Sequence, residues 1–210
     1  MSAAGLILAA GRSSRMGRDK ALLDYRGRPF LQHLAYLLLP RVDSLVVVLG
    51  HNEQRIRQAL PPSPRVQVVV NPDYERGMLT SLQSGLQRVG GQERAVLWAL
   101  VDHPAVRGST LDSLLAIARH DPAPVVIPRY EGKRGHPIVL SQRAAVELLG
   151  LDPGRSPQDV VRSYYPQAHF VDSADEGVVL DIDRPADYRG LAASAREPSV
   201  AHARGELGRR

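Results

Sequence analysis

Residues 5–23 read GLILAAGRSSRMGRDKALL, and this stretch decides the fold. It begins with an uninterrupted apolar run, Gly5–Ala9, and passes into a loop of small and basic residues. Apolar runs of this length are typical of strands that are buried on both faces of a parallel sheet. In open α/β sheets, ligands bind in the loops that follow such strands. The stretch therefore predicts an α/β sheet with a ligand site at the end of its first strand.

Other apolar runs of strand length alternate with segments of helical periodicity. The expected strands are Gly5–Ala9, Leu45–Leu49, Val66–Val70, Ala95–Val101 and Pro124–Ile127. The expected helices between them are Phe30–Leu39, Glu53–Leu60, Leu79–Val89 and Leu111–Ala118. This alternation indicates βαβ units, so we predict a Rossmann-like, doubly wound and mostly parallel sheet.

After residue 130 the expected elements follow one another more closely. They are strands at Pro137–Leu140, Ala168–Val171 and Val178–Ile182, and helices at Arg143–Leu149 and Pro157–Ser163. We interpret the closely spaced strands as antiparallel additions at the sheet edge, because no Gly/Ser/Pro-rich linker sets them apart as a second domain. We therefore expect one domain over residues 1–190 and a flexible basic tail over residues 191–210, where large apolar side chains are scarce.

The composition excludes several classes of protein. Of the 210 residues, 43% are hydrophobic and 23% are charged, which is ordinary for a globular protein. The chain has no cysteine, which rules out disulfides, iron–sulfur clusters, thiolate zinc sites and a cysteine nucleophile, and favours a reducing cytoplasm. No stretch approaches the ~20 consecutive apolar residues of a membrane helix, so we expect no membrane association.

The net charge of +5 and the pI of about 9.9 would suit a nucleic-acid-binding protein if the charge were spread over one face. It is not spread in that way. Residues 11–28 hold six Lys or Arg against two Asp, and residues 191–210 hold four Arg against two Glu. The rest of the chain is close to neutral. The distribution disfavours nucleic acid as a partner, and only the tail keeps that alternative open.

The first loop has the composition of a polyphosphate site. Small residues at Ala9, Ala10 and Gly11 allow a ligand to approach the backbone, and Arg15 and Lys20 supply positive charge. The loop matches neither the P-loop pattern nor the dinucleotide fingerprint. The alternative is a solvated basic loop without a ligand.

Asp102 is the first candidate for a metal ligand. It follows the expected strand Ala95–Val101, so its carboxylate should emerge over the ligand crevice, and Pro104 turns the chain away from the sheet. Mg²⁺ prefers oxygen ligands and takes one or two carboxylates from a protein. An aspartate after a strand also serves as a turn or cap residue, which is the alternative here.

The string LAAGRSSRMGRDKALL at residues 8–23 resembles the signature loop of the MobA-like nucleotidyltransferases, in particular the branch with molybdenum cofactor cytidylyl- and guanylyltransferases. Further matching motifs follow in the same order. They are Asn71-Pro72, GMLTSL at residues 77–82, VDHP at 101–104, RGHP at 134–137 and DIDRPADY at 181–188. The resemblance covers residues 4–190.

The resemblance implies transfer of a nucleoside monophosphate from a nucleoside triphosphate to an acceptor phosphate, with Mg²⁺ as cofactor and pyrophosphate as product. It implies a catalytic set of Arg15, Lys20 and Asp102 and an acceptor pocket lined by Arg134, Gly135 and His136. The implied nucleotide-binding residues are Leu8, Ala9, Ala10, Gly11, Ser14, Arg15, Lys20, Asn71, Gly77, Ser81 and Asp102. Some of these have plainer alternatives: Ser81 as an ordinary helix residue, Asn71 as a turn residue and His136 as a strand-entry residue.

The resemblance also implies metal ligands at Asp102 and Asp183. Arg184 stands where the family usually shows Thr, which leaves alternatives for the second ligand. Asp181 would share a face of the expected strand Val178–Ile182 with Asp183, because side chains alternate with period two. Asp183 could instead cap a helix over Pro185–Leu191.

Ala10 before Gly11 favours CTP, because the guanylyl branch tends to carry Gly at this position, and GTP is the other candidate. The expected acceptor is the terminal phosphate of a molybdopterin-type cofactor, and a molybdoenzyme is a candidate partner. The alternatives are transfer to another acceptor, such as a sugar phosphate, and a carrier module that binds a nucleotide or molybdenum cofactor without catalysis. A pure carrier has no need of a metal carboxylate beside a basic triphosphate loop.

Overall fold

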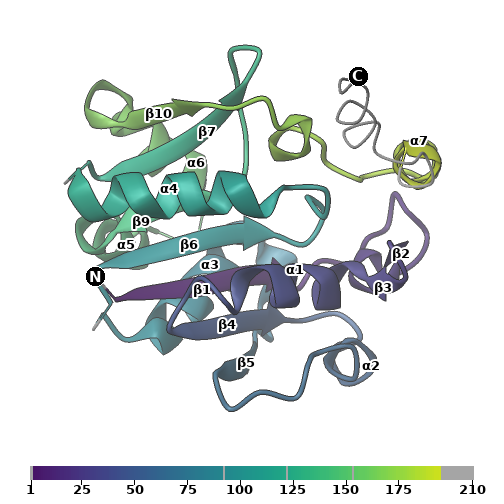
Figure 1. The fold of residues 1–210 in the computed structure, drawn as a ribbon. Coiled ribbons are helices and arrows are strands. Elements are labelled where there is room, and N and C mark those ends of the chain that lie inside the picture. Colours follow the sequence, from purple (N-terminus) through teal and green to yellow (C-terminus); the bar gives the residue numbers. More distant parts are fainter. Residues whose placement is uncertain (1, 92, 122, 153, 195–210) are drawn as a thin grey trace, which may run out of the picture.

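A central sheet carries helices on both of its faces in the computed structural model of the chain, which describes residues 2–91, 93–121, 123–152 and 154–194 (Figure 1). The sheet order is β10-β7-β9-β6-β1-β4-β5, and β8 pairs with β7. The strands of this sheet are β1 Ala3–Ala9, β4 Ser44–Leu49, β5 Val66–Val70, β6 Ala95–Leu100, β7 Val125–Tyr130, β8 Lys133–Arg134, β9 Ile138–Ser141 and β10 His169–Asp172. The helices are α1 Phe30–Leu38, α2 Glu53–Arg57, α3 Met78–Val89, α4 Gly108–His120, α5 Gln142–Leu149, α6 Pro157–Ser163 and α7 Pro185–Ser194. Within the described ranges, no helix has the length and apolarity needed to span a membrane.

The two faces of the sheet bury separate apolar clusters. On one face, α1 with Leu34 packs against β1 and α4 with Leu114 packs against β7 and β9, and these two helices lie in front of the sheet in Figure 1. On the other face, α3 packs against β1, β4 and β5, α5 packs against β6 and β9, and α6 packs against α5, with Leu82 and Leu148 fully buried. The expected doubly wound α/β architecture is confirmed.

We expected the antiparallel strands at the sheet edge, but one of them, β9, lies in the interior, and the other is the short β8, which pairs with β7. β9 pairs antiparallel with both β6 and β7, while the edge strand β10 pairs parallel with β7. β9 is apolar throughout its buried part, Ile138–Leu140, and can therefore occupy a position covered on both faces. The spacing of elements along the sequence correctly indicated short connections after residue 130. It could not indicate the order of the strands in the sheet.

The segment Val178–Ile182 does not form the expected strand. It follows a short 3₁₀ helix, Glu176–Val178, and crosses the carboxyl ends of the strands. Two hydrogen bonds join its backbone to distant segments, from His136 N to Val178 O at 2.8 Å and from Ile182 N to Asp102 O at 2.9 Å. Val178 and Ile182 are both buried, but each belongs to a different apolar cluster. These two buried side chains explain why the sequence resembles a strand here.

The C-terminal helix continues beyond residue 190. α7 ends at Ser194, and Leu191, which was assigned to the tail, is buried. The rest of the expected tail, residues 195–210, lies outside the described residues.

A third apolar cluster joins α7 to the first loop. It contains Met16 and Leu23 of the loop region, Phe30 at the start of α1, and Ile182 and Leu191 near the C-terminal end. A small hairpin that sequence periodicity did not indicate, β2 Asp24–Tyr25 with β3 Arg28–Pro29, lies beside this cluster.

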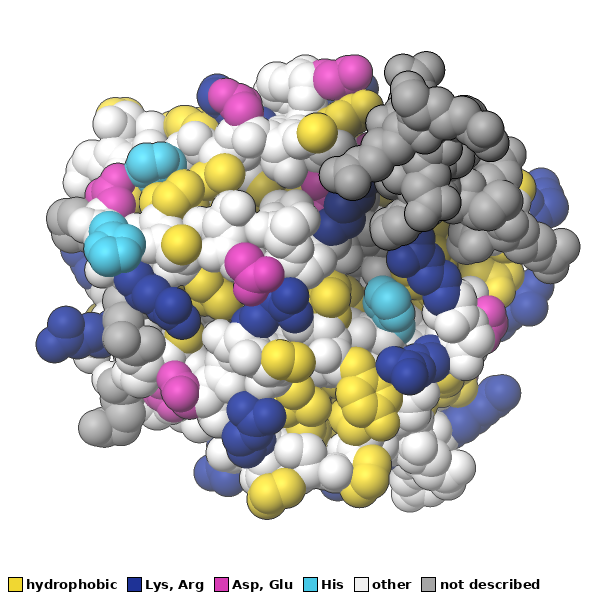
Figure 2. Space-filling view, viewed as in Figure 1, with side chains coloured by type: hydrophobic (Ala, Val, Ile, Leu, Met, Phe, Trp, Pro, Cys, Tyr) yellow, Lys and Arg dark blue, Asp and Glu magenta, His cyan; other side chains and the backbone are white. Residues whose placement is uncertain are grey.

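The charged side chains on the α1–α4 face are dispersed. Figure 2 shows Lys and Arg side chains interspersed with acidic and apolar ones over the part of this face that the structure describes. That part of the surface therefore presents no continuous basic area of the kind that binds a nucleic-acid backbone.

Candidate active site

The loop after β1 is organised around Ser13. Ser13 adopts a left-handed conformation with φ of 52°, and its carbonyl oxygen accepts hydrogen bonds from Met16 N and Gly17 N, both at 3.0 Å. Its hydroxyl accepts a hydrogen bond from Lys20 N at 3.1 Å. These bonds fold the loop back so that Lys20 returns toward the strand ends. Sequence reasoning selected Ser14 and missed Ser13, although both line the same cavity.

That cavity has a volume of about 260 Å³ and lies at the carboxyl ends of β1 and β6. It brings together every predicted nucleotide-binding residue except Asn71. The members are Leu8, Ala9, Ala10, Gly11, Ser14, Arg15, Lys20, Gly77, Ser81 and Asp102, with Asp183 beside them. A Cβ atom built on Gly11 would meet no atom within 4 Å, so the backbone there is open to a ligand.

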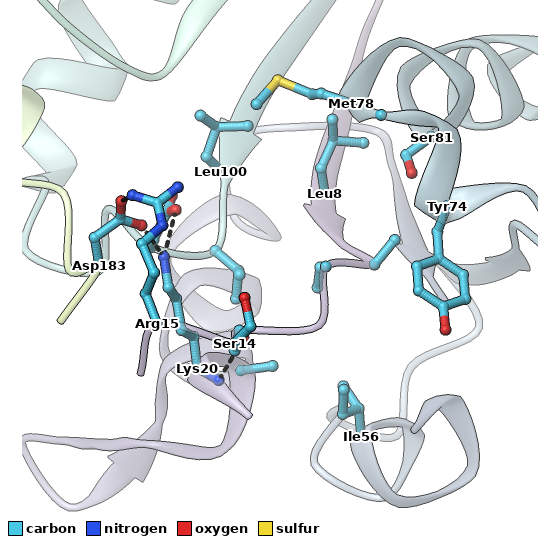
Figure 3. Close-up of a pocket in the computed structure, with 18 residues that line it drawn as sticks. Leu8, Ser14, Arg15, Lys20, Ile56, Tyr74, Met78, Ser81, Leu100 and Asp183 are labelled. Atoms are coloured by element: carbon cyan, nitrogen blue, oxygen red, sulfur yellow. Dashed lines mark hydrogen bonds and ion pairs between the residues drawn. The ribbon is translucent and has the colours of Figure 1, made fainter. Parts of the chain in front are cut away.

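One end of the cavity is charged (Figure 3). Lys20 Nζ donates a hydrogen bond to Asp102 Oδ2 at 3.1 Å and a second one to Asp183 Oδ1, while Arg15 Nη1 pairs with Asp183 Oδ2. The Lys20 side chain is 11% exposed, whereas that of Arg15 is 67% exposed. The hydrogen bond from Lys20 lowers the pKa of Asp183, and the positive charges of Lys20 and Arg15 act in the same direction.

The backbone positions the two carboxylates. Asp102 follows β6, where Val101 N donates to Leu8 O at 3.1 Å, and Ile182 N donates to the carbonyl of Asp102 itself. The alternative of a helix cap does not describe Asp183, because its carboxylate contacts Lys20 and Arg15. Asp187, in the first turn of α7, accepts hydrogen bonds from the backbone N–H groups of Asp183 and Arg184 and so fixes the backbone there.

Asp181 lies in a different environment. Without a strand at Val178–Ile182, the period-two argument that placed Asp181 and Asp183 on one face does not apply. Asp181 lines a neighbouring cavity, and Asp183 lines the first one. The geometry thus pairs Asp102 with Asp183.

The opposite end of the first cavity is uncharged. Figure 3 shows Tyr74 and Ser81 there, away from Lys20 and Arg15. Tyr74 was not selected from the sequence, although it lies between two of the quoted motifs, Asn71-Pro72 and residues 77–82. Its ring packs on the backbone of Gly50, where an added Cβ would lie 2.7 Å from Tyr74 Cγ.

Asn71 does not line the cavity but supports it from behind. It is buried, and its Nδ2 donates to Thr80 Oγ1 at 3.0 Å and to Ser81 Oγ at 2.9 Å. Its Oδ1 accepts a hydrogen bond from Asp73 N at 2.9 Å. Every polar group of this amide is therefore engaged within the protein, and Asn71 orients Ser81 where the sequence had suggested contact with the nucleotide.

The predicted acceptor residues Arg134, Gly135 and His136 line a second cavity of about 450 Å³, which shares Leu100 with the first. Arg134 lies over the ring of Tyr165, with 4.6 Å from its Cζ atom to the ring centroid. Gly135 is required for packing as well, because a Cβ there would collide with the carbonyl of Val178.

His136 is an uncharged group in this cavity. Burial lowers its pKa to about 4, and the nearby His103 acts in the same direction. Its ring lies 5.2 Å from that of Trp98, measured between centroids. Trp98 is a core residue, as the sequence indicated, and also lines the second cavity.

The charged end fits a divalent cation. Two carboxylates from separate parts of the chain already share one positive group, Lys20, and Asp102 Oδ1 is buried without a hydrogen-bond partner among the described residues. No group of three or more His, Cys, Asp or Glu side chains suited to a metal occurs in that part of the chain. Such a donor set suits a cation that takes its other ligands from water and phosphate.

Comparison with known proteins shows several relatives of similar length. Nicotine blue oxidoreductase of Paenarthrobacter nicotinovorans is 31% identical over 191 residues, which cover 85% of this chain and 91% of that one. The molybdenum cofactor cytidylyltransferase of Escherichia coli is 24% identical, covering 87% and 92% of the two chains. The molybdenum cofactor guanylyltransferase of Pseudomonas syringae is 30% identical, covering 91% and 94%.

Solved structures show the same fold. The crystal structure of Rv0371c from Mycobacterium tuberculosis superposes with a TM-score of 0.78 at 30% identity, covering 91% of this chain and 97% of that one. A manganese complex of the same protein has a TM-score of 0.76 at 28% identity, covering 92% and 100%. A model of the MobA-like NTP transferase domain matches residues 5–169. With that match across the first loop and most of the sheet, the chain belongs to the MobA-like NTP transferase family of nucleotidyltransferases.

Proposed function

We propose that this enzyme transfers a nucleoside monophosphate from CTP, or less readily GTP, to the terminal phosphate of a molybdopterin-type acceptor and releases pyrophosphate. The contact of Lys20 with both Asp102 and Asp183 carries the proposal, because it gathers opposite charges at one end of a cavity whose other end is neutral. A triphosphate suits the charged end, and a ribose and base suit Ser81 and Tyr74.

The reaction needs little covalent help from the protein. An ionised phosphate oxygen of the acceptor attacks the α-phosphorus of the nucleoside triphosphate and forms a new P–O bond. The bond between the α-phosphorus and the oxygen that bridges the α- and β-phosphates breaks, and pyrophosphate leaves with that oxygen. No imidazole base is required, and a neutral His136 serves binding. Lys20 and Arg15 neutralise charge on the departing pyrophosphate, which is how proteins accelerate transfers of this kind.

Asp102 and Asp183 are the proposed ligands for Mg²⁺, which would neutralise phosphate oxygens when bound. The second cavity is the proposed acceptor site, since it adjoins the first at Leu100 and carries Arg134. A molybdoenzyme that receives the product is the proposed partner. With no cysteine, the chain needs no oxidising compartment, and we propose that it acts in the cytoplasm.

The test measures pyrophosphate release with each of the four nucleoside triphosphates, with Mg²⁺ and with molybdopterin, molybdenum cofactor or a sugar phosphate as acceptor. We expect release with CTP to exceed release with GTP and to depend on a molybdopterin-type acceptor. Release with the sugar phosphate alone would identify a different acceptor, and no release with any combination would favour the carrier function.

Because one relative is named as an oxidoreductase, nicotine blue is assayed in parallel with a reduced nicotinamide cofactor. Turnover of nicotine blue without pyrophosphate release in the other assay would contradict the proposal.

A further inference from the structure

Lys20 is unusual in this chain both by type and by position. Lys20 and Lys133 are the only lysines among 27 basic residues, and all the others are arginines. Lys133 is exposed on β8, whereas Lys20 is buried at the charged end of the first cavity. The one buried lysine of the chain therefore lies between the two carboxylates proposed to hold a metal ion.

Two neighbouring carboxylates without a cation repel each other. Here the ammonium group of Lys20 donates one hydrogen bond to Asp183 and another to Asp102, the latter at 3.1 Å. Lys20 therefore lies between the two negative charges. In the nucleotide-free enzyme it provides the charge compensation that a divalent cation would otherwise provide.

Lysine is suited to a temporary role of this kind. Its ammonium is a compact charge on a flexible stem, whereas arginine presents a rigid planar fork. The Lys20 ammonium can therefore contact two carboxylates from different segments and later turn toward another anion. Arg15 differs from Lys20, because among the described residues it pairs with Asp183 alone, and its side chain is largely exposed.

We propose that Lys20 is a positioning residue that holds Asp102 and Asp183 in the nucleotide-free enzyme and moves from them to the triphosphate, so that divalent cation binding is coupled to nucleotide binding. This inference rests on the proposed function in one respect, the assignment of the two carboxylates as metal ligands. Such coupling is reciprocal: whatever factor the nucleotide adds to cation affinity, the cation adds to nucleotide affinity.

The test is Mn²⁺ binding to the full chain, measured by the electron paramagnetic resonance signal of free Mn²⁺, with and without a non-hydrolysable CTP analogue. Without nucleotide, we expect Lys20→Met to bind Mn²⁺ about tenfold more tightly than the wild type, because a competing charge has been removed. Lys133→Met removes the other lysine and should match the wild type. The nucleotide analogue should tighten Mn²⁺ binding about tenfold in the wild type and clearly less in Lys20→Met.

The proposal is overturned if, without nucleotide, Lys20→Met binds Mn²⁺ no more tightly than the wild type. Lys20 would then not compete with the cation for the two carboxylates. Thermal unfolding verifies that the variant is folded, and Lys20→Gln serves as a second neutral variant. The wild type alone also tests the coupling, because equal Mn²⁺ affinity with and without the analogue would refute it.

A double variant separates this inference from the proposed function. If Mn²⁺ still binds tightly to Lys20→Met combined with Asp102→Asn, the metal assignment itself is wrong. If the wild type binds Mn²⁺ tightly through Asp102 without nucleotide, the metal site stands and only the coupling fails.

Discussion

The carboxylates of Asp102 and Asp183 lie far apart in the chain, yet one ammonium group contacts both. Each aspartate had a plausible structural alternative as a turn or cap residue. In the structure, both side chains contact Lys20, and Asp187 bonds the backbone N–H groups of Asp183 and Arg184. At the scale of single residues, what distinguishes these two aspartates is that both carboxylates contact Lys20.

For this pair we expect Asp102→Asn and Asp183→Asn each to lower kcat/KM by about 10²- to 10³-fold, because each removes a charge that would hold the metal ion. The matched control is Asp181→Asn, which makes the same change two residues away in the second cavity. Pyrophosphate release is measured against Mg²⁺ concentration. The control should keep the wild-type Mg²⁺ dependence, and an Asp183→Asn variant that also keeps it would exclude Asp183 as a ligand.

At the scale of elements, the segment that crosses the strand ends connects stability to the site. Ile182 is fully buried in the cluster that joins the first loop to α7. Its backbone is bonded to Asp102, and its neighbour in sequence is Asp183. Packing of this one side chain therefore helps to set the distance between the two carboxylates.

We expect Ile182→Ala to lower the free energy of unfolding by about 2–5 kcal/mol, the usual range for a buried aliphatic side chain. It should also raise the apparent KM for Mg²⁺, because the backbone beside Asp183 loses its anchor. Leu191→Ala is the control, since Leu191 belongs to the same cluster but lies on α7. Denaturant unfolding and Mg²⁺ titrations are compared, and an equal rise of KM in both variants would show that only overall stability matters.

At the scale of the whole molecule, buried histidines make stability depend on pH. Burial lowers the pKa of His136 to about 4 and also lowers that of His103. An unfolded histidine has a pKa of about 6.5. Between these values the unfolded chain binds a proton that the folded chain does not, so acid favours unfolding.

We therefore expect the free energy of unfolding to fall as the pH drops from about 6.5 to about 4, by at most on the order of 3 kcal/mol for His136. His136→Gln should reduce the slope, and His120→Gln, on the exposed end of α4, should preserve it. Urea unfolding at a series of pH values measures this effect. A slope unchanged by His136→Gln would place the proton uptake elsewhere.

Much of the molecule could be predicted from local patterns. The strand and helix ranges up to residue 127 agree with the structure to within a few residues, because period and burial are readable in short windows. The first loop could also be selected, because its small residues leave backbone N–H groups open to an anion and Arg15 and Lys20 add positive charge.

The sequence by itself determined the alternation of strands and helices, the end of the sheet at which the loops meet, and the chemistry of the first loop. Only the tertiary structure decided that β9 lies inside the sheet, that Val178–Ile182 crosses the strand ends, and that Asp183 rather than Asp181 contacts Lys20. It also showed that Tyr74 lines the cavity and that Asn71 does not. These outcomes depend on which distant segments pack against each other, and a local pattern of apolar and polar residues contains no record of that.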